Sequence, residues 1–174
     1  KAKNIAVLSV ATDVSIAEDC KNLIDKCIDE FGRIDILINN AGISMRALFN
    51  ETNLKVIERV INTNFWGTVF CTKYALTYLL QSKGSLVGVS SIAGHIGLPE
   101  RSAYSASKFA MHGFLESVRS ENMDNNLHVL IACPGFTASN IRKSALTKDG
   151  STQNESPRNE QKMMSAEQVA SKIV

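Results

Sequence analysis

The stretch YSASK, residues 104–108, holds a phenol and an ammonium four positions apart. On a helix, residues at i and i+4 share one face, so Tyr104 and Lys108 would be neighbours. A free phenol has a pKa of roughly 10 and exchanges protons poorly at neutral pH. An ammonium about 4 Å away, at an effective dielectric constant near 20, favours the phenolate by roughly 4 kcal/mol. The pair therefore predicts a phenol with a lowered pKa that exchanges a proton with a substrate oxygen. Taken alone, the spacing is equally typical of a solvated helix surface.

The elements that would position this pair alternate along the chain. Short apolar runs predict strands at residues 5–11, 34–38, 85–90 and 127–133. Longer amphipathic stretches predict helices at residues 16–31, 54–80, 102–122 and 165–174. Glu167 is placed for a capping box at the start of the last helix. Strands that alternate with helices predict an α/β fold with a parallel sheet covered on both faces.

In such sheets, ligands bind beyond the carboxyl ends of the strands. Polar residues or glycines follow each predicted strand, at residues 13–14, 39–42, 90–94 and 134–137. The loops after the strands are therefore the predicted site.

An ordered set of motifs, spread over essentially the whole chain, resembles the short-chain dehydrogenase/reductase family. The motifs are NNAG (residues 39–42), a helix asparagine, a serine, YxxxK (residues 104–108) and PG (residues 134–135), in this order. The resemblance implies a Rossmann-like, doubly wound parallel sheet with helices on both faces. It also implies an NAD(P)-dependent oxidoreductase that transfers hydride between nicotinamide and a carbonyl or secondary alcohol. A non-catalytic relative that senses a dinucleotide or acts as a scaffold is the alternative.

The resemblance assigns four catalytic roles. Tyr104 is the acid/base, and Lys108 lowers its pKa and orients the ribose. Ser91, thirteen residues before Tyr104, holds the substrate oxygen, with Ser90 as the second candidate. Asn64 holds a water that links Lys108 to solvent.

Two of these roles have structural alternatives. For the asparagine, Asn62 competes with Asn64, and a buried helix asparagine also serves as a purely structural hydrogen-bonding group. For the serine, the alternative is a hydroxyl that caps the local backbone.

The cofactor is expected to be NADP or NAD. The resemblance places Asp13 and Val14 beside adenine and Thr137 near the nicotinamide carboxamide. Small residues after the second strand would let the backbone approach the ribose. The cofactor-binding residues assigned in this way are Asp13, Val14, Asn40, Ala41, Gly42, Tyr104, Lys108, Pro134, Gly135 and Thr137.

The pattern departs from the family at its front. The family opens with a TGxxxGxG turn that receives the pyrophosphate, and the ten glycines here include no GxxxGxG. We therefore interpret residues 1–174 as one partial domain, incomplete at both ends, either an internal part of a longer enzyme or an enzyme without its disordered or cleaved ends. We expect this piece to bind the dinucleotide weakly. The residues that choose between NAD and NADP are missing with the front.

Residues 137–164 are polar and lack an apolar period. We interpret them as a mobile loop over the substrate pocket, and a plain disordered insertion is the alternative. The stretch YSASKFAMHGF resembles the steroid- and lipid-directed branch of the family. Catalytic motifs report chemistry rather than pocket shape, so the substrate is taken only as a small-molecule carbonyl or alcohol.

Composition limits the other functions. A formal charge of +2 with scattered basic residues disfavours nucleic acid as a partner. Four cysteines without a CxxC pair are typical of free thiols in a cytoplasmic protein. No run approaches the roughly 20 apolar residues of a membrane span.

The histidines and the long helices lead to two further expectations. The three histidines have no metal-ligand spacing, so no metal site is expected. The helices at residues 54–80 and 102–122 carry apolar residues beyond one face, and in the family such helices pair between subunits. The chain is therefore expected to form a homodimer or homotetramer.

Overall fold

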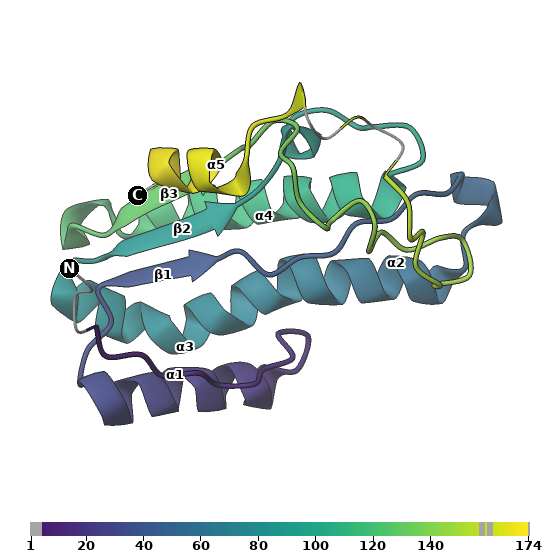
Figure 1. The fold of residues 1–174 in the computed structure, drawn as a ribbon. Coiled ribbons are helices and arrows are strands. Elements are labelled where there is room, and N and C mark those ends of the chain that lie inside the picture. The colour runs from purple at the N-terminus through teal and green to yellow at the C-terminus, as the bar shows by residue number, and fades with distance from the viewer. Residues whose placement is uncertain (1–4, 157–158, 160–161, 174) are drawn as a thin grey trace.

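The fold is built on a parallel sheet of three strands. The computed structural model describes residues 5–156, 159 and 162–173. The strands are β1 (Ile36–Asn39), β2 (Ser85–Val89) and β3 (His128–Ala132), in the order β1-β2-β3. Within the described residues, this parallel sheet with crossover helices confirms the predicted α/β class (Figure 1).

Five α-helices accompany the sheet in the described part of the chain. They are α1 (Ala17–Phe31), α2 (Leu54–Ile61), α3 (Gly67–Ser82), α4 (Ser102–Glu121) and α5 (Ala166–Ile173). Short 3₁₀ turns lie at η1 (Phe49–Glu51), η3 (Ile92–Gly94) and η4 (Met123–Asn125). Among the described residues, every helix is too short or too polar to span a bilayer.

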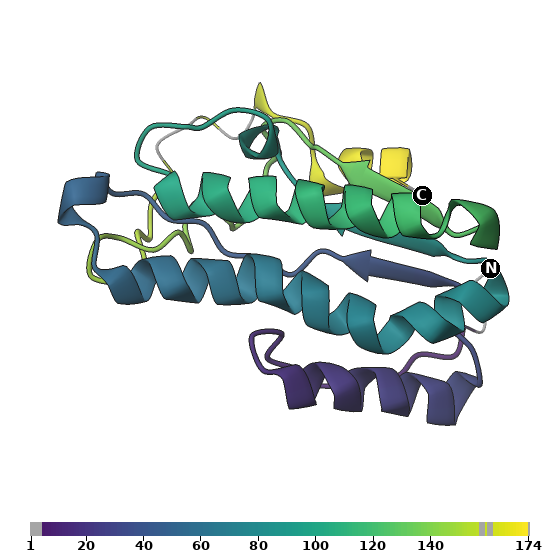
Figure 2. The ribbon, with the colours of Figure 1, turned by 180° about the vertical axis from the view of Figure 1, so that it is seen from behind.

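The main core lies between the sheet and one layer of helices. In Figure 2, α3 and α4 lie across one face of the strands, with α1 beside α3, and α5 lies on the far side. Buried apolar residues of this core are Ile24, Ile34, Ala75, Leu79, Leu86, Met111, Leu115, Val118, Leu127 and Val129. Side chains alternate along a strand, so Leu37 packs on this core while Ile36 and Ile38 stay exposed on the opposite face.

The strand predicted at residues 5–11 is wrong. The described residues of this segment have no strand assignment, and Ile5 and Val7 are 71% and 83% exposed. A strand is defined by its hydrogen-bonded neighbour, and no other described segment forms a ladder with this one. An apolar run shows that a segment is suited to pairing, but it does not specify the partner.

The single helix predicted at residues 54–80 is interrupted. Between α2 and α3, the chain forms one π-helical turn, η2 (Asn62–Trp66), and the flanking backbone stays helical. A π turn adds one residue to the helical repeat, and such turns often occur at functional sites. Asn64, at its centre, is fully buried.

The last helix begins as predicted but with a different capping partner. Ser165 N donates to Gln168 Oε1 at 2.9 Å, and Gln168 N donates to Ser165 Oγ at 3.2 Å. The capping box therefore uses Gln168 rather than Glu167, because the residue three positions after the cap closes it.

Residues 137–164 are tied to the rest of the fold where they are described. Leu146 is buried and pairs with Met45, and Thr137 pairs with Met164. Leu146 also joins Met45, Val56 and Val60 in a second apolar cluster beneath the pocket described below. The segment thus contributes to the core, and its mobility stays a prediction.

Candidate active site

A pocket of about 790 Å³ opens beyond the carboxyl ends of the three strands. Its size is typical of small-molecule sites. It brings together residues from the loops after β1, β2 and β3, from α4 and from α5. The predicted site residues that line it are Asn40, Gly42, Ser90, Ser91, Tyr104, Lys108, Pro134, Gly135 and Thr137.

Tyr104 and Lys108 share the inner face of α4. The Lys108 Nζ atom lies 5.9 Å from the centre of the Tyr104 ring. Lys108 is only 3% exposed, and its ammonium donates a 2.8 Å hydrogen bond to the carbonyl oxygen of Val89 at the end of β2. The helical spacing therefore places both groups in the pocket, as the sequence predicted.

The pKa of Tyr104 shifts in the direction opposite to the prediction. Burial raises it above its ordinary value of 10, and the Ser91 hydrogen bond and the charge of Arg101 only partly oppose this. Burial also lowers the pKa of Lys108 to about 8. The prediction that Lys108 lowers the Tyr104 pKa is wrong here, because removing the phenol from water disfavours its charged form more strongly than nearby cations favour it.

The two serines after β2 point to different partners. Ser91 lies near enough to Tyr104 for its hydroxyl to lower the pKa of the phenol, and this hydroxyl accepts from Ala93 N at 3.2 Å. The Ser90 hydroxyl lies 2.6 Å from His112 Nε2. Ser91 is therefore the serine that the structure brings to the phenol, and Ser90 belongs to another group.

Asn64 ties the π turn to the loop after β1. Its side chain accepts from Ile43 N at 2.8 Å and donates to Ile43 O at 2.9 Å. It also donates to Ser107 Oγ on α4 at 3.0 Å. The competing Asn62 is exposed. These bonds give Asn64 the structural role that the sequence left open, and its role in a water relay stays a prediction.

Gly42 lies where Asn64 and Lys108 meet. A Cβ atom at this position would lie 3.3 Å from Asn64 Oδ1 and 3.7 Å from Lys108 Nζ. Any side chain here would fill the space over the NNAG loop that both polar groups border. The residues present therefore suit the close approach of a flat ligand to the backbone of this loop.

Three predicted cofactor residues do not line this pocket: Asp13, Val14 and Ala41. The Asp13 carboxylate accepts from Ser15 N and Ser15 Oγ, and these bonds lower its pKa. Val14 packs on the start of α3, where a Cβ at Gly67 would lie 2.8 Å from Val14 Cγ2. The contact of Asp13 and Val14 with adenine stays a prediction.

Sequence reasoning missed two groups near this pocket. One is a set of arginines that line it, Arg46, Arg101 and Arg142. Arg101 lies three residues before Tyr104, and this helical spacing is a signal that could have revealed it. The other group is His95, His112 and Cys133, whose ligand atoms lie within 4.8 Å of one another. Spacing along the chain gave no sign of it, because its members come from three separate segments.

Known proteins share this fold and these motifs. The family profile of short chain dehydrogenases matches residues 1–150. The 11-beta-hydroxysteroid dehydrogenase A of Arachis hypogaea is 41% identical over 138 residues, which are 79% of this chain and 39% of that protein. Dehydrogenase/reductase SDR family member 7B of Rattus norvegicus is 40% identical over 144 residues, 82% of this chain and 44% of that protein. The chain thus spans less than half the length of these two relatives.

A solved structure of similar sequence has the same fold. "ElxO with NADP Bound" is 36% identical, with a TM-score of 0.71 over 76% of this chain and 54% of that one. The profile match covers most of the chain, including the NNAG, serine, YxxxK and PG positions gathered around the pocket. These matches, together with the parallel sheet and the site at its carboxyl edge, establish that the chain belongs to the short-chain dehydrogenase family.

Proposed function

We propose that the protein containing this chain is an NAD(P)-dependent oxidoreductase that transfers hydride between nicotinamide and a carbonyl or secondary alcohol. The observation that supports it best is the meeting of Ser91, Tyr104 and Lys108 in one pocket at the carboxyl edge of the sheet. The 36% identical ElxO, solved with NADP, supports the same class of cofactor. The choice between NADP and NAD is left open.

Tyr104 moves the proton. Its raised pKa keeps the phenol protonated at neutral pH, which suits donation to a carbonyl oxygen during reduction. The Ser91 hydroxyl, which lies close to Tyr104, is placed to hold the same oxygen. A bound nicotinamide supplies or accepts the hydride. In the reverse direction the same phenol would accept the proton of an alcohol, so the proposed site serves both directions.

Lys108 and Asn64 support the phenol. The buried ammonium of Lys108, held by Val89 O, is placed to orient the ligand. Its pKa of about 8 allows it to pass on a proton near neutrality. Because Asn64 Oδ1 and Lys108 Nζ border the same space over Gly42, we propose that a water there completes a relay to solvent.

The cofactor would be held by the loops after the strands. Asn40 and Gly42 after β1, and Pro134, Gly135 and Thr137 after β3, line the pocket on either side of Lys108. Their backbone and small side chains suit the nicotinamide and ribose half of the dinucleotide.

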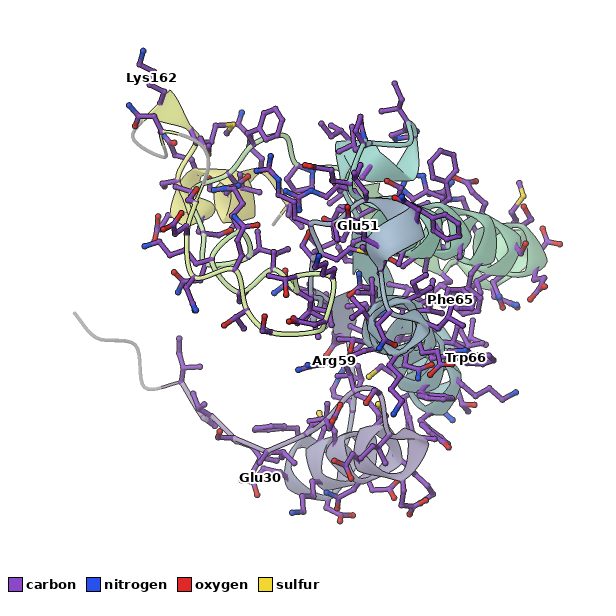
Figure 3. The ribbon with its side chains drawn as sticks, turned by 90° about the vertical axis from the view of Figure 1, so that its right-hand side faces the viewer. Glu30, Glu51, Arg59, Phe65, Trp66 and Lys162 are labelled. Carbon is purple, nitrogen blue, oxygen red and sulfur yellow. The ribbon has the colours of Figure 1, made fainter. Side chains whose placement is uncertain are left out.

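We also propose a homodimer or homotetramer in the cytoplasm. Aromatic rings gather on the outer surface of η2, α3 and α4, where Figure 3 shows Phe65 and Trp66. The Trp66 ring stacks on Phe70 at 5.5 Å and is 43% exposed, and Phe109 is 46% exposed. A second copy would bury this apolar face. Four free cysteines suit a reducing compartment.

The proposal is tested by turnover of the full-length protein. NADPH and NADH oxidation is followed with a panel of ketones and aldehydes, and cofactor binding is measured by titration calorimetry. Carbonyl-dependent oxidation supports the proposal. Cofactor binding without turnover of any carbonyl or alcohol would instead identify a non-catalytic dinucleotide sensor. Titration of residues 1–174 alone tests the expected weak binding, which an affinity tighter than micromolar contradicts.

A further inference from the structure

The charges around the pocket are unbalanced. Among the described residues that line it, four are cationic and only Glu100 is anionic. The cationic residues are Arg46, Arg101, Lys108 and Arg142. Together with Glu100, their formal sum is +3, whereas the whole chain carries only +2. A large part of the excess positive charge of this molecule therefore faces one cavity.

Arg101 is the arginine best placed to bind a ligand. Glu100 pairs with Arg46 at 2.8 Å, which leaves Arg101 without a carboxylate partner in the described part of the chain. Arg101 donates to Ser44 Oγ and lies near enough to Tyr104 for its charge to act on the phenol. Burial, Arg46 and Arg142 disfavour the positive charge of Arg101 more than Tyr104 and Glu100 favour it, and a bound anion would offset this imbalance.

We propose that the carbonyl substrate carries an anionic group, a carboxylate or a phosphate, that binds Arg101 in this pocket. A guanidinium presents paired N–H donors that match the oxygens of either anion. Apolar residues, Leu98, Phe136, Ile141, Val169 and Ile173, line the rest of the cavity and suit an apolar body on the same substrate. This inference rests on the proposed oxidoreductase function and names its substrate class.

The test compares matched ketones in the full-length protein. Neutral ketones are assayed beside analogues of equal length that end in a carboxylate or a phosphate, in wild type, Arg101→Met and Arg101→Lys. Arg101→Met is expected to lower the ratio of kcat/KM, anionic over neutral, by about 10- to 100-fold, the usual worth of a hydrogen bond to a charged group. Arg101→Lys restores part of the ratio because it keeps the charge. The exposed Arg33, paired with Asp35, gives the control Arg33→Gln, which keeps the wild-type ratio.

Each outcome has one meaning. A better phosphate than carboxylate substrate, or the reverse, identifies the anion. Equal use of neutral and anionic ketones by the wild type overturns the inference. A rise in the cofactor Kd without a change in the substrate ratio in Arg101→Met also overturns it, because the arginine would then serve the dinucleotide. Absence of turnover with every ketone contradicts the proposed function itself.

A second observation is independent of this pocket. Cys133 Sγ lies 3.4 Å from His95 Nε2 and 3.7 Å from His112 Nε2. A tetrahedral ion with Zn–S bonds near 2.3 Å and Zn–N bonds near 2.1 Å separates a sulfur ligand from a nitrogen ligand by roughly 3.6 Å. The sulfur is therefore already spaced from both nitrogens as in a zinc-like site, and all three donor atoms lie within 4.8 Å of one another.

The backbone is shaped around this group. A Cβ at Gly94 would lie 2.5 Å from His112 Nε2 and 2.8 Å from Ser90 Oγ, so only glycine leaves room for the imidazole. The His95 ring is exposed and meets the His112 ring edge-on at 4.6 Å, which gives an ion access from solvent. We propose that His95, His112 and Cys133 bind Zn²⁺ or a similar thiophilic divalent ion, with water as the fourth ligand. Binding releases the thiol proton of Cys133 to the buffer.

Cobalt substitution tests this site without relying on enzyme activity. Wild-type full-length protein titrated with Co²⁺ under reducing conditions is expected to show a thiolate-to-cobalt charge-transfer band at one equivalent, and Zn²⁺ should displace the Co²⁺. Cys133→Ser removes the band. His95→Ala, at an exposed position, is expected to weaken Co²⁺ binding more than about 100-fold. This loss is larger than that seen when a residue that only hydrogen-bonds to a metal ligand is replaced. The controls Cys27→Ser and His128→Ala, outside the group, keep the wild-type titration. A band that persists in Cys133→Ser, or wild-type affinity in His95→Ala, would refute the site.

Discussion

Ser90 and Ser91 are neighbours in the chain but serve opposite sides of the end of β2. Ser91 reaches Tyr104 in the pocket, whereas Ser90 reaches His112 in the group with Cys133. The pocket side is organised by one helix face, which carries Tyr104 and Lys108. The histidine and cysteine side is organised by the meeting of three separate segments. A site carried by one helix face can therefore be predicted from sequence spacing, whereas a site assembled from separate segments cannot.

The largest effect is expected at Tyr104 and separates the two sides. Tyr104→Phe keeps the ring that packs on the second apolar cluster but removes the proton donor. Loss of general acid catalysis should lower kcat about 10²- to 10⁴-fold. Circular dichroism and the cobalt titration are expected to match the wild type. Near wild-type turnover would remove Tyr104 from the mechanism.

A substitution of Asn64 tests whether the pocket depends on the hydrogen bonds that tie the π turn to the loop after β1. Asn64→Ala leaves the half-buried N–H and C=O groups of Ile43 without their side-chain partner. We expect a loss of about 3 kcal/mol in the free energy of unfolding, measured by urea denaturation, because unsatisfied buried polar groups are costly. Asn62→Ala, at the exposed neighbouring position, is the control. Equal losses in the two variants would contradict the structural role of Asn64.

The two serines give the most direct comparison. Ser91→Ala should lower kcat/KM about 100-fold, as removal of one hydrogen-bond donor to a reacting oxygen commonly does. Ser90→Ala is expected to lower it at least tenfold less and to change the cobalt titration instead. If Ser90→Ala proves the more harmful to turnover, the assignment of the two serines is reversed.

Lys108 gives the smallest expected change in stability, and the sign of this change depends on pH. Because its pKa is lowered to about 8 in the folded chain, the unfolded chain binds more protons between about pH 8 and 10.5, and stability rises with pH there. Lys108→Met removes this rise and loses the bond to Val89 O. The lowered pKa of Lys108 reduces the stability of the wild type by on the order of 3 kcal/mol. Loss of the hydrogen bond to Val89 O reduces the stability of the variant by about 1 kcal/mol.

We therefore expect Lys108→Met to be about 2 kcal/mol more stable than wild type at pH 7 while losing turnover. Thermal unfolding of both proteins from pH 7 to 10.5 measures the difference. A constant difference across this range would show that Lys108 has an ordinary pKa in the folded state.

Local features of the site were predictable from sequence, and collective ones were not. The i, i+4 face of Tyr104 and Lys108 follows from helix geometry alone. The direction of the Tyr104 pKa shift depends on how deeply the folded chain buries the phenol, which no local pattern records. The Cys133 group was missed for the same reason, since its ligands meet only in the folded chain.

The same limit applied to the fold. Three of the four predicted strands and the alternation of strands with helices are confirmed, with boundaries shifted by one or two residues. The segment at residues 5–11 has strand-like composition but no partner among the described residues. The polar segment at residues 137–164 was interpreted as a mobile loop or a disordered insertion, yet it buries Ala145 and Leu146, and Leu146 joins the second apolar cluster.

The π turn between α2 and α3 makes this part of the chain intolerant of changes in length. Val56 and Val60 before the turn face the cluster beneath the pocket, whereas Ala75 and Leu79 after it face the sheet. Deleting one residue within η2 would produce a more regular helix but rotate one half against the other by about 100°. One of the two halves would then present its polar side to the interior.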